Sequence, residues 1–120
     1  MDEIKPSIEI LDRPTYTEAL IGPGKLPDWA YVDLAARTRT FLDSPLLVVW
    51  EAESADDVDI LQTFNLGMAL ADSRVRIAIV FGRRDIKQAG RFTELVARNR
   101  GARVRTFGDI SSAKAWLGVD

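Results

Sequence analysis

The stretch "LLVVW", residues 46–50, decides the fold because every residue in it is apolar. A strand with one face in solvent alternates apolar and polar residues, whereas a strand that is covered on both faces is apolar throughout. We therefore expect residues 46–50 to form a strand in the middle of a sheet, with other elements packed on both of its faces.

The segments around this strand predict the rest of the sheet. Before it, "SIEIL" (7–11) and "YTEALIG" (16–22) alternate polar and apolar residues around the turn "DRPTY", which is typical of a β-hairpin. After it, "RVRIAIVFG" (74–82) and "ARVRTF" (102–107) are typical of further strands. The sequence thus predicts an antiparallel hairpin followed by three more strands.

Helical patterns fall between these strands, at residues 28–42, 57–71 and 84–99, and a short final helix follows with Asp109 as its N-cap. Strands that alternate with helices of this length indicate parallel crossover connections. Because the opening hairpin adds an antiparallel pair, the predicted fold is α/β with a mixed β-sheet, in the order ββαβαβαβα.

The apolar residues of two helices predict which faces point inward. In helix 57–71 the expected inward residues are Ile60, Leu61, Phe64, Met68 and Ala71. Leu66 and Leu70 lie beside that face, and Trp29 lies on the outer side of helix 28–42. These three residues are a candidate interface for a partner, a second copy or a lipid chain, unless a neighbouring helix covers them.

Composition limits the chemistry. The 120 residues suffice for a single domain, 1–120, and the net charge of −2 predicts no general attraction to nucleic acid or anionic lipid. Without cysteine or histidine, the chain lacks disulfides, thiolate nucleophiles and the usual general base. We expect a cytoplasmic protein without a signal peptide, transmembrane segment, cofactor, metal site or catalytic residues.

Two stretches resemble those of a known family. "GKLPDWAYVDL" (24–34) is similar to the segment after the second strand in SpoIIAA-like proteins of the STAS domain superfamily. "VRTFGDISSAKAWLGV" (104–119) is similar to that family's ending, in which a strand finishes on Phe, an acidic residue caps a helix and Ala-Trp-Leu follows. The order of elements over nearly the whole chain is also that of STAS domains. The resemblance implies a STAS-like domain.

An acidic loop follows the central strand and contains Ser54. In phosphorylated STAS proteins the corresponding loop carries an Asp-Ser-Ser-Gly type sequence, so the resemblance makes Ser54 a candidate phosphorylation site. Here the second serine and the glycine are missing, and Asp56, Asp57 and Asp59 would repel a phosphate, so we expect no phosphorylation. The residues alone leave two other interpretations, capping of the next helix and a Mg²⁺ or Ca²⁺ site, although their spacing fits no known loop motif.

Basic residues form a stripe on helix 84–99 and just before it, and they are a candidate face for an anion or a partner: Arg83, Arg84, Lys87, Arg91 and Arg98. Such a stripe is either a solvated helix face or a contact surface. The basic residues of 83–105 outnumber Asp85 and Glu94, so the charge of the molecule is unevenly distributed. Phe92 is expected to point inward, which disfavours nucleic acid and favours an acidic protein partner.

These observations predict a non-enzymatic STAS-like binding or regulatory domain that acts through protein–protein contacts. Carriage of a small apolar or lipid-like ligand between helices and sheet is the alternative, and a carboxylate-based enzyme using Glu51, Asp56 and a lysine comes third. The expected partner is an acidic protein, with a homodimer and an apolar small ligand as further expectations and no nucleic acid.

Overall fold

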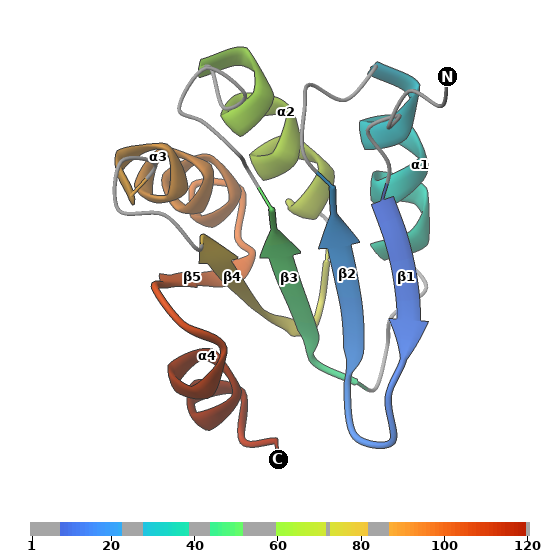
Figure 1. The fold of residues 1–120 in the computed structure, drawn as a ribbon. Helices are drawn as coiled ribbons and strands as arrows, with labels where there is room; N and C mark the ends of the chain where they lie inside the picture. Colours follow the sequence, from blue (N-terminus) through green and yellow to red (C-terminus); the bar gives the residue numbers. More distant parts are fainter. Residues whose placement is uncertain are drawn as a thin grey trace, which may run out of the picture.

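The computed structural model of the chain describes residues 8–22, 28–38, 44–51, 60–71, 73–81 and 87–119, except for the side chains at positions 28, 38, 60, 62 and 87–90. Within these residues the elements follow one another along the chain as shown in Figure 1. In order, they are β1 (Ile8–Asp12), β2 (Thr17–Ile21), α1 (Asp28–Thr38), β3 (Leu46–Trp50), α2 (Ile60–Leu70), β4 (Arg76–Phe81), α3 (Lys87–Arg98), β5 (Arg103–Phe107) and α4 (Ile110–Leu117).

The described strands form one sheet in the order β1-β2-β3-β4-β5, with β3 at its centre. The β1–β2 pair is antiparallel, and the turn between them is closed by a 2.9 Å hydrogen bond from the Arg13 N–H to the Tyr16 carbonyl oxygen. The other neighbouring pairs are parallel. The predicted α/β fold, with its opening hairpin, mixed sheet and central strand 46–50, is therefore confirmed.

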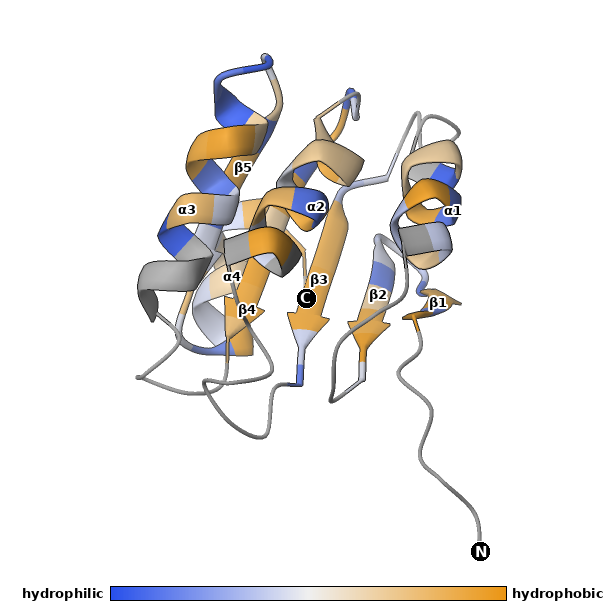
Figure 2. Ribbon diagram, turned by 90° about the horizontal axis from the view of Figure 1, so that it is seen from above, coloured by the Kyte–Doolittle hydropathy of each residue, from blue (hydrophilic) through white to orange (hydrophobic). Residues whose placement is uncertain are grey.

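The parallel part of the sheet grows in one direction, so each new strand is added beside the previous one. Right-handed crossovers, which are nearly universal, then carry every connecting helix to the same face. Accordingly, α1, α2 and α3 form one layer, while α4 follows the last strand and packs on the opposite face (Figure 1). Figure 2 shows the apolar strands β3 and β4 together with this three-helix layer.

The sheet separates two hydrophobic clusters, and β3 contributes to both. Leu46, Val48 and Trp50 pack in the larger cluster with residues of α1, α2 and α3, whereas Leu47 and Val49 belong to the smaller cluster beneath α4. The alternation follows from the strand geometry, which points successive side chains to opposite faces. Burial on both faces of β3 therefore accounts for its unbroken apolar run.

The final helix α4 is capped at both ends. The Asp109 carboxylate accepts hydrogen bonds from the Ser112 N–H at 2.7 Å and from the Ser112 hydroxyl at 2.9 Å, which lowers the pKa of Asp109 below its ordinary value. At the other end Gly118 has φ 76°, a left-handed conformation that glycine adopts without strain. The predicted Asp109 cap is confirmed.

The predicted inward face of α2 is wrong in part. Leu61 and Phe64 are 57% and 42% exposed, while Leu66 and Leu70 are fully buried. The reason is that α2 lies between α1 and α3 in the helical layer (Figure 1). A helix with neighbours on both sides is apolar around most of its circumference, so the apolar spacing alone does not identify the side that meets the sheet.

Helices α2 and α3 are in close contact through small and β-branched residues. The buried Thr93 hydroxyl of α3 donates a 3.0 Å hydrogen bond to the Thr63 carbonyl oxygen of α2. Thr93 and Ala97 are both fully buried, which turns Arg91, Leu95 and Arg98 outward. Within the described residues, no helix is both long and apolar enough to cross a bilayer.

Candidate partner-binding surface along the β5 edge

Two neighbouring hollows lie along β5. One, of about 680 Å³, includes Arg91, Leu95 and Thr106 in its lining, and the other, of about 600 Å³, includes Val104 and Trp116. Glu94 and Arg98 line both hollows, so the two adjoin. We call the exposed arginines that line them the arginine edge: Arg76, Arg91, Arg98, Arg103 and Arg105.

Three different elements supply the arginine edge. Arg91 and Arg98 come from the outer face of α3, and Arg76 comes from β4. Arg103 and Arg105 alternate along β5 with Val104, which is buried in the larger cluster, so both arginines lie on the sheet face that carries α4. The packing of α3 against one face of β5 and of α4 against the other therefore brings the arginines together.

Only part of the predicted basic stripe falls within the described residues. Arg91 and Arg98 are exposed on α3, as predicted. Arg83 and Arg84 lie outside the described residues, and so does the side chain of Lys87, although its backbone opens α3. The stripe did not include Arg76, which joins the surface because β4 and β5 are parallel neighbours.

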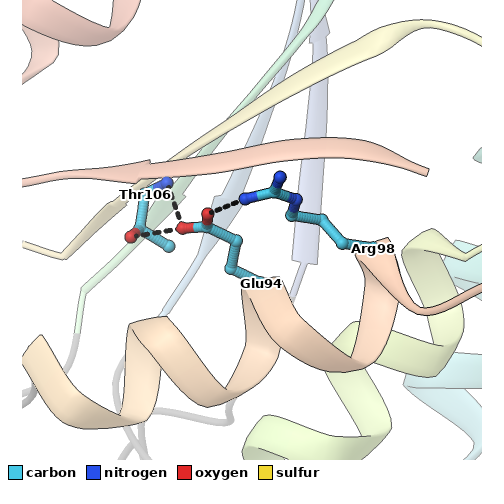
Figure 3. Close-up of polar contacts among 3 residues, drawn as sticks. All are labelled: Glu94, Arg98 and Thr106. Carbon is cyan, nitrogen blue, oxygen red and sulfur yellow. Dashed lines mark hydrogen bonds and ion pairs between the residues drawn. The ribbon is translucent and has the colours of Figure 1, made fainter. Parts of the chain in front are cut away.

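Glu94 and Thr106 join α3 to β5 beside Arg98 (Figure 3). One oxygen of the Glu94 carboxylate, Oε2, accepts hydrogen bonds from the Thr106 N–H at 3.1 Å and from the Thr106 hydroxyl at 2.9 Å. The other oxygen, Oε1, accepts from Arg98 at 3.1 Å. The side chain of Glu94 is only 18% exposed, whereas that of Arg98 is 64% exposed. The Glu94 carboxylate thus accepts hydrogen bonds from three donors, while Arg98 extends into solvent.

Like charges meet between β4 and β5. Arg76 and Arg103 are direct partners in the register, an arrangement that is unfavourable unless something offsets it. Arg76 is turned toward the end of α4, where it donates hydrogen bonds to the carbonyl oxygens of Trp116 at 3.0 Å and of Leu117 at 2.8 Å. These carbonyls lie at the negative end of the helix dipole, which offsets the charge of Arg76. Arg103 has no such contact among the interactions described.

The arrangement is suited to binding anions. Guanidinium groups are permanent cations that only donate hydrogen bonds, and their planar fork fits carboxylates and phosphates. Within the described residues, no group of three or more acidic, histidine or cysteine side chains could hold a metal ion. Glu51 is exposed at the end of β3, and the remaining residues of the acidic loop, Ser54 and Asp56 included, lie outside the described residues.

The predicted interface of Trp29, Leu66 and Leu70 is wrong for the two leucines. Both are fully buried in the larger cluster, covered by the neighbouring helices of the layer, and cannot contact a partner on the surface. Trp29 is 70% exposed on α1, as predicted. Trp116 is half-buried against Phe107, with 5.8 Å between the ring centres, in the smaller cluster.

Comparison of the chain with protein-family models, with curated proteins and with solved structures found no match in any of the three.

Proposed function

We propose that this protein is a non-enzymatic binding or regulatory domain that acts through protein–protein contacts, and that its arginine edge binds an acidic segment of the partner. One observation carries the proposal: exposed arginines line both hollows, and the acid among their lining residues, Glu94, is already bound by Thr106 and Arg98. A surface of this kind attracts negative charge and steers an acidic partner toward it.

The STAS-like relationship is part of the same proposal. It is supported by the order of the elements and by the last helix, which has Asp109 as its N-cap and packs Trp116 against Phe107. On this proposal the protein is a STAS-like, SpoIIAA-like domain in which the surface, rather than a reaction centre, performs the function.

Two aromatic residues near the arginine edge favour a protein partner over a single-stranded nucleic acid. Proteins that bind single strands stack bases on exposed aromatic rings. Here Phe107 and Trp116 contact each other, and the guanidinium groups of Arg105 and Arg76 lie 5.5 Å and 5.7 Å from the respective ring centres. These contacts occupy part of the ring surface on which bases would stack.

The alternative, carriage of an apolar or lipid-like ligand, requires an apolar cavity between helices and sheet. In the described part of the chain, that region is filled by fully buried core residues such as Ile21, Val48 and Ile79. The apolar hollow that the structure does describe, of about 350 Å³, is an open groove between α1 and α2, and Val32 and Leu61 are in its lining. This outward location lends the carrier function no specific support.

A charge reversal tests the proposal. We expect wild-type protein to bind a fluorescent glutamate-rich peptide, and Arg103→Glu to weaken binding several-fold because it reverses a charge of the arginine edge. Arg37→Glu on α1 makes the same change of net charge at a distant site and should leave binding unchanged. Fluorescence anisotropy measures both variants. Equal affinities for wild type and Arg103→Glu, or no binding at all, would contradict the proposal.

A further inference from the structure

Building on the proposed function, we infer that the acidic partner binds as an extended strand added to the open edge of β5, and that Glu94, which holds the Thr106 N–H, blocks part of that edge until the partner displaces it. The partner is thus an extended acidic peptide segment, and Glu94 regulates access to the β5 edge.

β5 is the last strand of the described sheet, so one of its two edges is unpaired. The Thr106 N–H lies on that edge, because it donates to Glu94 from α3 and not to β4. Backbone groups of alternate residues in a strand point to the same edge, so those of Val104 point outward with it. An edge of this kind is the template on which an extended peptide adds a strand.

Glu94 shows that the donors on this edge bind a hydrogen-bond acceptor. A single carboxylate there collects a backbone N–H, a hydroxyl and a guanidinium, all within 3.1 Å. Hydrogen bonds with a charged partner are the stronger ones, so this set of donors forms a built carboxylate site whose occupant belongs to the same chain. A partner strand competes with Glu94 for the Thr106 N–H, because a backbone carbonyl oxygen of the added strand pairs with it.

The spacing of the arginines fits the side-chain period of a strand. Arg103 and Arg105 are two residues apart on the same face of β5, and side chains on an added strand that share this face also repeat every second residue, about 7 Å apart. The matching partner segment therefore carries acidic residues at alternate positions. The five residues of β5 span about 17 Å, which accommodates two or three such acids.

The same arginines exclude a second copy of this chain as the occupant. Pairing two β5 edges would bring Arg103 and Arg105 of one copy next to those of the other, and like charges on neighbouring strands are destabilising. Charged residues on an edge strand are a common protection against self-association. The edge thus repels itself while it attracts an acidic strand.

The test uses a heptapeptide with glutamate at alternate positions and threonine between them, together with the same peptide carrying N-methyl groups on the backbone amides of one edge. Charge and side chains are unchanged by methylation, but the hydrogen bonds to β5 are blocked. We expect wild-type protein to bind the methylated peptide at least about tenfold more weakly, because more than one hydrogen bond is lost.

Two substitutions of Glu94 separate charge from edge pairing. Glu94→Gln removes the negative charge but keeps an acceptor for Thr106, whereas Glu94→Ala also releases the Thr106 N–H. Both variants should bind the unmethylated peptide more tightly than wild type, and Glu94→Ala more tightly than Glu94→Gln by about threefold, the contribution of one hydrogen bond. Circular dichroism verifies that both variants are folded.

The outcomes distinguish this inference from the proposed function. If both peptides bind wild type equally and the two Glu94 variants do not differ, binding is by charge alone, and strand addition is overturned while the proposed function stands. If neither peptide binds and single-stranded RNA does, both proposals fail. Tighter binding of the unmethylated peptide, with Glu94→Ala the tightest variant, supports strand addition.

Discussion

Gly67 of α2 lies so close to Val96 of α3 that a Cβ atom placed on Gly67 would come within 2.7 Å of the Val96 Cβ. The same atom would also lie 2.9 Å from the Thr93 carbonyl oxygen. The helix pair that carries two of the five arginines of the arginine edge therefore depends on the absence of a side chain at position 67.

Gly67→Ala should destabilise the protein. Alanine favours a helix by about 1 kcal/mol over glycine, but overpacking costs about 1–3 kcal/mol, and here the backbone of α3 must move. We expect a net loss of about 1–2 kcal/mol, measured by urea denaturation. Gly108→Ala is the control, because nothing lies within 4 Å of the added atom. Equal stabilities for the two variants would contradict the described contact between α2 and α3.

Leu66 and Trp29 should differ in their effect on stability. Leu66 is fully buried, so Leu66→Ala is expected to cost about 2–5 kcal/mol, while Trp29 is mostly exposed and Trp29→Ala should change stability by no more than about 0.5 kcal/mol. Denaturation curves for the two variants provide the comparison. A homodimer through Trp29 stays a prediction, and sedimentation of Trp29→Ala beside wild type at high concentration tests it.

Arg76 should hold α4 onto the sheet. Arg76→Gln removes the charge and weakens the bonds to the carbonyl oxygens of Trp116 and Leu117. We expect faster hydrogen exchange of the α4 amides and a stability loss of about 1 kcal/mol. Arg74→Gln, an exposed position just before β4, removes the same charge as a control. Unchanged exchange in α4 after Arg76→Gln would mean that this contact does not anchor the helix.

The N-cap of α4 should make the free energy of unfolding depend on pH. Hydrogen bonds from Ser112 lower the pKa of Asp109 below 3.8, so the folded state binds the proton more weakly than the unfolded state. The stabilisation is therefore fully present above the ordinary pKa of 3.8 and is lost as the pH falls through the lower pKa of Asp109 in the folded state. Asp109→Asn keeps an acceptor that does not ionise. The stability difference between wild type and Asp109→Asn should shrink from pH 7 to pH 3, and a constant difference would contradict this account.

Much of the fold follows from local patterns. The apolar run 46–50 forms the strand between the two clusters, and the alternating segments form the antiparallel hairpin. Asp109 caps the last helix. Each of these features can be predicted because it depends on residues that are close in sequence. The inward face of α2 cannot be predicted in this way, because it depends on neighbours that are distant in sequence. Leu66 and Leu70 are covered by packing in the helical layer, and no periodicity within one helix reveals that.

The candidate site likewise contains some residues that can be predicted from one helix and others that only the fold brings together. Arg91 and Arg98 are predictable because they recur on one face of a single helix. Arg76 joins them only through the register of β4 against β5, and the role of Glu94 depends on the approach of α3 to Thr106. A sequence signal did exist for part of this surface, since Arg103 and Arg105 alternate with apolar residues in a short strand next to the basic helix.

The most direct test of the central claim is the location of the bound peptide. Two-dimensional ¹H–¹⁵N spectra of the wild-type protein should be recorded during titration with the glutamate–threonine heptapeptide. The account predicts that the largest shifts fall on the amides of β5, above all Val104 and Thr106, and on the outer face of α3 around Arg98, while the amides of α1 are unaffected. Shifts concentrated instead on α1 and the α1–α2 groove, or no shifts at all, would contradict the claim that the arginine edge binds the partner.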